Sequence, residues 1–559
     1  MKRLRELENL VREFGAAATA RKLALLDTLA RARLASPAQV LRLHEALCFL
    51  RAYPDNPRTL RKVEDMLAAF DKRPDLRRCA ADLESSGIAG TEILFPFYDE
   101  TARWLVRRWP DRVTIEWDQI DASSIDWLNS ALELLVLPAE VPAVDEYGYS
   151  LGEWIERLKH PDETDAAFLV RRLATLPAAL PLRQLVYEQL GLWLRVHSGT
   201  NTPSRTRAKA PRRAAHWQTT PLTSARPDLK AAVRQPPLSV RELSSRQGAR
   251  YVELAREAMV TRSRDLDAFA YGDPADVRLI DCGDGLEFAA IGMLPERRLL
   301  LEAVYGFLTL RNGVPTGYVL NSALYGSAEI AYNVFDTFRG ADAAHVYGRV
   351  MRMVHHVFGA DAFTIYPYQL GHDNDEGLAS GAWWFYQKLG FRPRDESTSA
   401  LMERELARMR RHAGHRSSLA TLRKLARENV YWHSGRARAD VIGLLPLANA
   451  GLAVSAMLRR RFDVPREAAS RTLEREAADL LGVRSQLGWS PGERLAWRRW
   501  APLVMTLPGV VRWSPSDRAA LVSVVRAKGG RRESDFVLAF DRHQPLRKAL
   551  RWLVTTSFE

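Results

Sequence analysis

The chain has 559 residues and a mass of 63.2 kDa, more than the roughly 250 to 300 residues that one hydrophobic core usually spans. Its formal net charge is +14, and 47% of its residues are hydrophobic, which is enough to build sizeable cores. Cys48, Cys79 and Cys282 are too far apart in the sequence to suggest a disulfide framework or a cysteine metal site. Residues 1–14 lack the apolar core of a secretory signal. We therefore expect a cytoplasmic protein of several domains.

Residues 1–198 predict a helical N-terminal domain, because apolar residues alternate with charged ones at helical spacing and prolines mark helix ends. Within it, Gly148, Ser150 and Gly152 fit the G-x-S-x-G pattern of a hydrolase nucleophile. That pattern needs a buried strand before the serine, and the prolines upstream of Gly148 exclude one. We interpret Ser150 as the N-cap of a helix.

Residues 199–240 differ from their surroundings in composition. They are rich in Ser, Thr, Pro and Ala, and they carry eight Lys and Arg residues against one acid, Asp228. This composition predicts a disordered basic linker. It is compatible with contact to nucleic acid or to an acidic partner, but a solvated tether is the simpler interpretation.

Residues 241–398 predict a domain that combines strands and helices. A helix is expected at 243–260, and two apolar runs, 299–310 and 314–321, flank Asn312-Gly313. Asn-Gly between such runs is the strongest short-range signal for a hairpin. A third strand follows at 329–335, with Ile330, Tyr332 and Val334 on one face and Glu329, Ala331, Asn333 and Phe335 on the other.

The segment after this strand alternates helix and strand. Val346, Val350, Met353 and Val357 fall at i, i+4, i+7 and i+11, which predicts a one-sided helix. A strand is expected at 363–366. The helix that follows contains residues 381–386, and Gly390 is its expected C′ residue.

The order of these elements and three pieces of sequence resemble the GNAT superfamily of acyl-CoA-dependent N-acyltransferases. The helix from Ala382 to Phe391, with Tyr386, Lys388 and Gly390, is similar to the second conserved motif of that family. Residues 339–344 stand where the family places its pyrophosphate loop, and the third piece is the preceding meander with Asn312-Gly313. The resemblance covers roughly residues 243–395.

The resemblance implies an α+β fold, a central GNAT-like mixed sheet with helices, flanked by mostly helical regions. It implies acyl-CoA as co-substrate and an amine as acceptor. It gives Tyr386 the role of protonating the leaving thiolate, for which a tyrosine is suited because it keeps its proton at neutral pH. Candidate bases for the amine proton are Glu329 and Glu376. The cofactor-binding residues that it implies are Phe335, Thr337, Arg339, Gly340, Ala341, Asp342, Ala343 and Ala344.

Asp342 departs from the family pattern, which has glycine there. Backbone N–H groups at a helix N-terminus bind phosphate without a cationic side chain. A carboxylate about 4 Å from a phosphate charge opposes this by roughly 4 kcal/mol at surface-like dielectric. Arg339, Arg349 and Arg352 are candidates to offset part of that repulsion. Alternatively, Asp342 is a helix cap in a domain that has lost its cofactor.

Residues 399–559 predict a basic helical region in which tryptophans and arginines are mixed, as at Trp497 to Trp500. This mixture suits nucleic acid, an acidic protein or a membrane interface, although tryptophans at helical spacing usually belong to a core. The charge-free stretch 441–458 is short for a spanning helix, so we expect no transmembrane segment. No histidine or cysteine spacing indicates a metal.

Two hypotheses follow for the function. The first is an N-acyltransferase that takes its acyl group from a CoA thioester or from an acidic carrier protein. The second is a non-catalytic GNAT-like scaffold whose helical flanks bind a partner protein or nucleic acid. In the scaffold, Trp383 or Tyr368 is expected to fill the cofactor slot.

Overall fold

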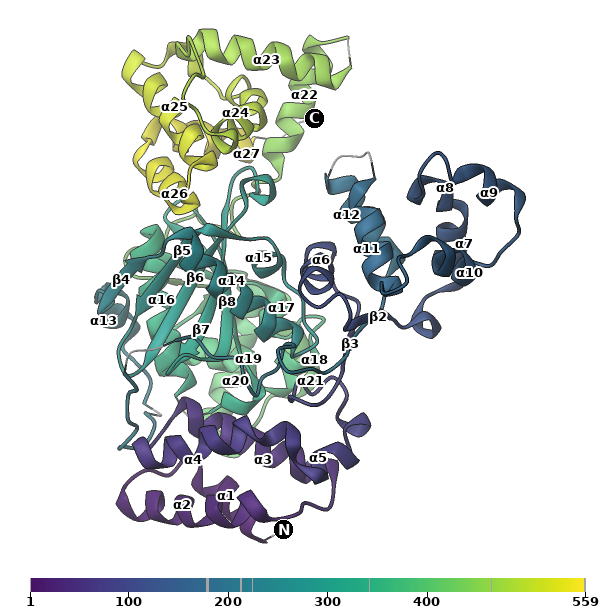
Figure 1. Ribbon diagram of the computed structural model, residues 1–559. Coiled ribbons are helices and arrows are strands. Elements are labelled where there is room, and N and C mark those ends of the chain that lie inside the picture. The colour runs from purple at the N-terminus through teal and green to yellow at the C-terminus, as the bar shows by residue number, and fades with distance from the viewer. Residues whose placement is uncertain are drawn as a thin grey trace. The chain divides into compact units, whose positions relative to one another are not determined.

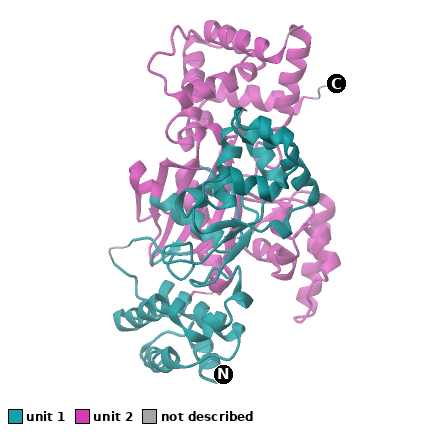
Figure 2. Ribbon diagram, turned by 45° about the vertical axis from the view of Figure 1, so that its right-hand side comes forward, with its two compact units in different colours: residues 1–221, 250–271, 310–315 teal, residues 222–249, 272–309, 316–559 magenta. Residues whose placement is uncertain are grey.

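The computed structural model describes residues 2–176, 180–211, 214–223, 225–340, 342–463 and 465–556. Figure 1 shows its helices and strands in chain order, and its contacts divide the chain into two units (Figure 2). Unit 1 consists of Met1–Pro221, Arg250–Tyr271 and Leu310–Pro315. Unit 2 consists of Leu222–Ala249, Gly272–Thr309 and Thr316–Glu559. Both helices and strands are present in each unit, so the expected α+β class is confirmed.

Unit 1 is mostly helical, as the sequence predicts for residues 1–198. Its small three-stranded antiparallel sheet, in the order β1-β3-β2, was not predicted, because each strand has only three residues. Ser150 caps α10 and forms a capping box with Glu153, which confirms the N-cap interpretation. The elements of the first 198 residues are α1 (Lys2–Leu10), α2 (Ala16–Arg31), α3 (Pro37–Ala52), α4 (Pro57–Ala68), α5 (Pro74–Arg78), β1 (Ile93–Phe95), α6 (Asp99–Arg108), β2 (Val113–Ile115), α7 (Ala122–Ser130), α8 (Leu132–Leu135), α9 (Val141–Glu146), α10 (Leu151–Leu158), α11 (Asp165–Thr175), α12 (Leu180–Leu190) and β3 (Leu194–Val196).

Residues 202–210 are mostly buried, which differs from the disordered linker that the composition of 199–240 predicts, whereas most of the described residues from 211 to 240 are exposed or half-buried. Thr206 is buried, and its hydroxyl accepts a hydrogen bond from the Ala89 backbone N–H at 2.8 Å. Arg51 donates to the carbonyl oxygens of Arg205 and Thr206. Short polar side chains are thus buried here through hydrogen bonds. Composition alone does not reveal this kind of packing, because it contains few large apolar residues. The regular elements of this stretch are α13 (Leu229–Arg234) and the start of β4 (Ser239–Glu242).

A nine-stranded sheet forms the core of unit 2, in the order β11-β12-β10-β9-β8-β7-β6-β5-β4. The Asn312-Gly313 turn joins β7 to β8, and both turn residues have positive φ, as a tight hairpin requires. The strand β9 pairs antiparallel with β8 and parallel with β10. The strands are β5 (Gly272–Asp281), β6 (Leu286–Met293), β7 (Ala303–Arg311), β8 (Val314–Leu324), β9 (Ser327–Val334), β10 (Ala362–Ile365), β11 (Arg392–Pro393) and β12 (Val430–His433).

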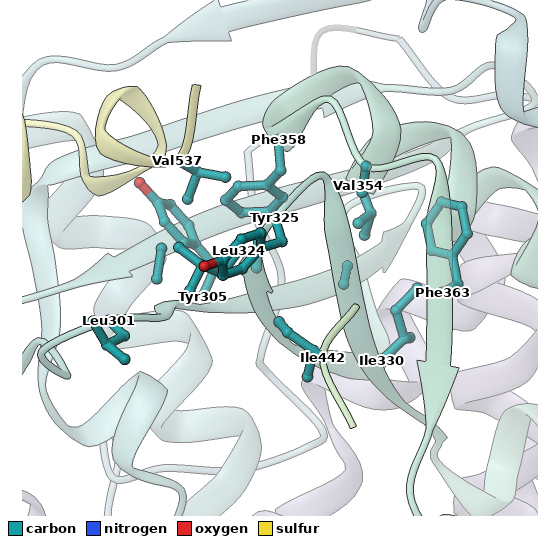
Figure 3. Packing of buried hydrophobic residues seen from close by; sticks show 14 of the residues in the cluster. Leu301, Tyr305, Leu324, Tyr325, Ile330, Val354, Phe358, Phe363, Ile442 and Val537 are labelled. Carbon is teal, nitrogen blue, oxygen red and sulfur yellow. The ribbon is translucent and has the colours of Figure 1, made fainter. Parts of the chain in front are cut away.

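Helix α16 (Ala343–Phe358) connects β9 to β10 and covers one face of the sheet (Figure 1). The four apolar residues that predicted this helix are all buried. Phe358 packs edge-on against Tyr305 of β7, with ring centroids 5.2 Å apart. Figure 3 shows Val354 and Phe358 meeting side chains from several strands and Val537 from a C-terminal helix.

The remaining helices complete the two units. The prediction of helices alone beyond residue 398 missed β12, which lies between β10 and β11, so the sheet extends past the expected domain end. Trp497 and Trp500 are 1% exposed, so these tryptophans belong to the core. The helices are α14 (Ser245–Val260), α15 (Asp267–Ala270), α17 (Pro367–Leu370), α18 (Asp375–Ala379), α19 (Ala382–Lys388), α20 (Glu396–Arg411), α21 (Leu419–Leu425), α22 (Asn449–Arg461), α23 (Arg466–Leu481), α24 (Pro491–Val504), α25 (Pro515–Gly529), α26 (Glu533–Arg542) and α27 (Gln544–Thr555).

Candidate active site

The two parallel strands β9 and β10 separate after a short ladder. Their pairing ends at Thr364 opposite Glu329, and β10 itself ends at Ile365. On its other side β9 stays paired with β8 as far as Val334, opposite Gly317. Beyond Glu329, no strand of the described chain pairs with the second edge of β9. An unpaired strand edge is where an extended group can add to a sheet, and here the Arg339 guanidinium already donates to the Val334 carbonyl oxygen at 3.3 Å.

Residues 331–334 lie along this free edge, and each of them is half-buried. Most of the earlier residues of β9, such as Ala328 and Ile330, are fully buried. Both faces of the strand thus become more accessible toward its C-terminal end. This end of β9 is one place in unit 2 where an extended group can be placed beside a strand.

Glu329 stands at the point where the two strands separate. Across the sheet it faces Ser322 of β8 and Thr364 of β10, so these three side chains share one face. Burial raises the pKa of Glu329 to about 7, and the nearby carboxylate of Glu302 adds to this, while a hydrogen bond from Ser322 acts in the opposite direction. A carboxyl group with this pKa can accept and release a proton at neutral pH.

Two further residues of this face were missed by the sequence reasoning. Glu302 precedes β7, and Tyr366 follows β10. Burial raises the pKa of Tyr366 to about 12, and the carboxylates of Glu329 and Glu302 add to the effect, so the three groups lie close together. No pattern in the sequence marks Glu302 or Tyr366, because their proximity depends on strand register.

Tyr386 lies on the opposite face of the sheet, beneath α16. Its ring centroid is 5.5 Å from that of Tyr347 of α16 and 5.8 Å from that of Phe391. Tyr347 in turn lies 5.5 Å from Tyr332 of β9, so aromatic rings connect Tyr386 to the free edge of the strand. Burial raises the pKa of Tyr386 well above its usual value, so this side chain keeps its proton.

Tyr347 was not singled out from the sequence. It is completely buried, and its hydroxyl has no hydrogen-bond partner within the part of the chain that the structure describes. Tyr347 directly follows Val346, which begins the predicted apolar face of the helix. This position next to the apolar face could have identified Tyr347 as buried. The pattern could not show that a phenol group lies between α19 and β9.

The expected phosphate-binding turn leads from β9 into α16. Phe335 is 3% exposed and packs against Tyr318. Thr337, Gly340, Ala343 and Ala344 are half-buried, and Ala341 lies outside the described residues. These residues are brought together at the helix start, as expected from their order in the chain.

Asp342 is the N-cap residue of α16 and is 6% exposed. Its position agrees with the alternative interpretation as a helix cap. However, its carboxylate accepts no capping hydrogen bond from the first turn of the helix as described. The N–H groups of this turn are therefore not satisfied by the Asp342 side chain.

Three arginines were expected to offset the negative charge of Asp342, but each of them pairs with or donates to other residues. Arg339 pairs with Asp336 at 2.8 Å and also contacts Glu376. Arg349 donates to the Cys282 carbonyl oxygen, and Arg352 donates to the Ala232 carbonyl oxygen at 3.1 Å. The turn thus has several carboxylates and one nearby arginine that is already paired. This arrangement is unfavourable for a doubly charged pyrophosphate.

Glu376 is placed less favourably than Glu329 for base catalysis. Its side chain is 53% exposed and pairs with Arg339. Its carboxylate is therefore already engaged by the Arg339 guanidinium. Of the two candidate bases, only Glu329 combines burial with a position on the open strand.

The scaffold hypothesis assigns Trp383 or Tyr368 to the cofactor slot, and the two side chains are placed differently. The indole N–H of Trp383 donates to the Leu425 carbonyl oxygen at 2.9 Å, which directs this ring toward α21. Tyr368 is 59% exposed.

Comparisons with protein-family models, with curated proteins and with solved structures give no match to this chain. Among the described residues, no group of three or more His, Cys, Asp or Glu side chains is arranged to hold a metal ion. In the same part of the chain, none of the helices is both long and apolar enough to cross a bilayer.

Proposed function

We propose that the protein is an N-acyltransferase whose thioester donor lies along the free edge of β9, with Glu329 as general base. The observation that carries the proposal is the position of a glutamate with a pKa near neutrality at the point where β9 and β10 separate. The order β9, turn, α16, β10 and α19 is also the order that the resemblance to the GNAT superfamily implies. Fold and site chemistry support the same activity.

The reaction takes place on the Glu329 face of the sheet. The acceptor amine attacks the thioester carbonyl carbon, and Glu329 takes a proton from the amine nitrogen. The N–H groups on the edge of β9 stabilise the tetrahedral oxyanion. The C–S bond then breaks, and the proton that Glu329 took up passes through solvent to the thiolate. The products are an amide and a free thiol, and Glu329 is again ionised. Tyr386, which the resemblance implies as the acid, is 3% exposed and burial raises its pKa, so this step does not use its proton.

The charges at the turn bear on the choice of donor. Asp342, Asp336 and Glu376 oppose the pyrophosphate of CoA, and they oppose an acidic carrier protein for the same reason. A thioester of pantetheine has the same reactive arm without phosphate. We therefore expect acyl-pantetheine to serve as donor at least as well as acyl-CoA.

The test is release of free thiol from acyl-pantetheine and acyl-CoA in the presence of a panel of primary amines. We expect amine-dependent release that rises with pH to a plateau above about pH 7, and a loss of about 100-fold in Glu329→Gln. With acyl-pantetheine as donor, Glu376→Gln is the matched control, because it removes an exposed carboxylate that repels only a phosphate-bearing donor, and we expect a change of about twofold or less. Thiol release that is equal in Glu329→Gln and the native protein would exclude this base.

The scaffold hypothesis remains a second candidate because of one observation. Asp342 is buried at the helix start where the resemblance implies phosphate. A scaffold predicts that no thioester is bound or consumed with any amine. The thiol-release experiment therefore separates the two candidates.

A further inference from the structure

Two neighbouring helices of unit 2, α22 and α27, contain no acidic residue. Helix α22 has three arginines, Arg459 to Arg461, and α27 has Arg547, Lys548 and Arg551. The helices belong to one buried apolar cluster, to which α22 contributes Ala453 and α27 contributes Leu550. The side-chain N–H of Asn449 at the start of α22 donates to the Val554 carbonyl oxygen of α27 at 2.8 Å.

Each helix exposes one large apolar side chain on the side away from this core. Leu452 of α22 is 59% exposed and Trp552 of α27 is 56% exposed. Both fractions are high for side chains of this size, because burying either one usually stabilises a protein by about 1.5 to 3 kcal/mol. Ser455 and Arg459 continue the exposed side of α22, and Lys548 and Arg551 continue that of α27.

Most of the cations on these helices are not neutralised. Arg461 pairs with Glu476 at 2.9 Å, and Arg547 pairs with Asp440 at 3.0 Å. The other four cations are exposed and form no ion pair with any residue that the structure describes. They are Arg459, Arg460, Lys548 and Arg551.

We propose that α22 and α27 form a surface that binds an anionic lipid bilayer. Exposed tryptophan and leucine beside lysine and arginine are the combination by which amphipathic helices enter the headgroup region. The cations bind the lipid phosphates and carboxylates, and the apolar side chains bury in the acyl boundary.

The charge-free sequence that leads into α22 and forms most of it favours lipid over nucleic acid. Residues 441–458 contain no charge, and Pro446 is exposed while Leu447 is half-buried. An aliphatic segment gains free energy in the acyl region but has little to offer a nucleic acid, which favours stacking aromatics and phosphate-binding cations. Because α22 has only 13 residues, contact with the membrane is peripheral.

Co-flotation of the full chain with vesicles tests the proposal. Vesicles of phosphatidylcholine alone are compared with vesicles of phosphatidylcholine and phosphatidylserine. We expect binding to the anionic vesicles only, weaker at high salt. The double variant Lys548→Gln/Arg551→Gln should bind the anionic vesicles at least about tenfold more weakly than the native protein. Trp552→Ala should also reduce binding.

The matched control is Arg3→Gln/Arg5→Gln, which removes the same charge from exposed positions of α1 in unit 1. We expect the control to bind like the native protein, and thermal unfolding confirms that all variants are folded. Absence of binding to anionic vesicles would overturn the proposal. Equal loss in the control would also overturn it, as would binding of a single-stranded oligonucleotide through Lys548 and Arg551 without vesicle binding.

Discussion

Glu329 shows how the surroundings of one residue determine its chemistry. The sequence predicts that Glu329 lies on a strand and makes it one of two candidate bases. The other candidate, Glu376, has the same side chain but is exposed and forms an ion pair with Arg339. The difference comes from register, which sets Glu329 between Ser322 and Thr364 on a partly covered face. Strand periodicity could predict the face of Glu329, whereas the neighbouring Glu302 and Tyr366 required the tertiary structure.

The raised pKa of Glu329 predicts a pH-dependent contribution to stability. Its pKa rises from 4.5 to about 7 on folding, so the folded state holds a proton that the unfolded chain releases. The stability from this group is fully present below about pH 4.5 and is lost as the pH rises through about 7. Glu329→Gln imitates the protonated form.

We therefore expect Glu329→Gln to be more stable than the native protein by about 3 kcal/mol near pH 8, with a difference close to zero below about pH 4.5. Urea unfolding at a series of pH values measures this difference. Glu376→Gln should show no such rise in stability. A difference for Glu329→Gln that is independent of pH would show that its carboxyl group titrates normally.

At the scale of elements, the close approach of β8 and β9 defines the edge on which the candidate site depends. A Cβ atom on Gly317 would lie 2.3 Å from the Asn333 carbonyl oxygen and 3.1 Å from the Val334 Cα. Both atoms belong to the backbone of β9, so a rotamer change cannot relieve the overlap. Only glycine lets β8 pair with the open end of β9.

We expect Gly317→Ala to lower the free energy of unfolding of unit 2 by about 2 to 3 kcal/mol and to reduce thioester binding, because β9 has to move. Denaturant unfolding followed by tryptophan fluorescence measures the first effect. Gly451→Ala is the control, since a Cβ atom there meets open space on α22. Alanine at that helical position should stabilise the protein by about 0.5 to 1 kcal/mol. Equal stabilities of the two variants would contradict the tight approach of the strands.

Sequence patterns predicted those elements whose signals are local. The Asn312-Gly313 hairpin, the face of α16 and the alternation in β9 all depend on residues within one turn or strand, and the structure contains each of them. The strand β12 was missed because its four residues pair only with segments distant in the chain. The packing of residues 202–210 was missed because polar contacts such as those of Thr206 leave no hydrophobic pattern.

At the scale of the whole molecule, the two units are each built from separate chain segments. The tip of the β7–β8 hairpin, Leu310–Pro315, groups with unit 1, while the rest of both strands belongs to unit 2. The Asn312 side chain donates to the Ala52 carbonyl oxygen at 2.8 Å within unit 1. The composition suggested domains that follow one another along the chain. Such a division is wrong for these units, because each of them contains three separate segments of the chain.

The central claim is that a thioester lies beside β9, and a calorimetric titration of the full chain tests it most directly. Acetyl-pantetheine and acetyl-CoA are titrated into the native protein and into Asp342→Asn. We predict that the native protein binds acetyl-pantetheine. We also predict that Asp342→Asn strengthens binding of acetyl-CoA by about tenfold or more and leaves acetyl-pantetheine binding unchanged. Failure of both thioesters to bind either protein would contradict the account and favour the scaffold.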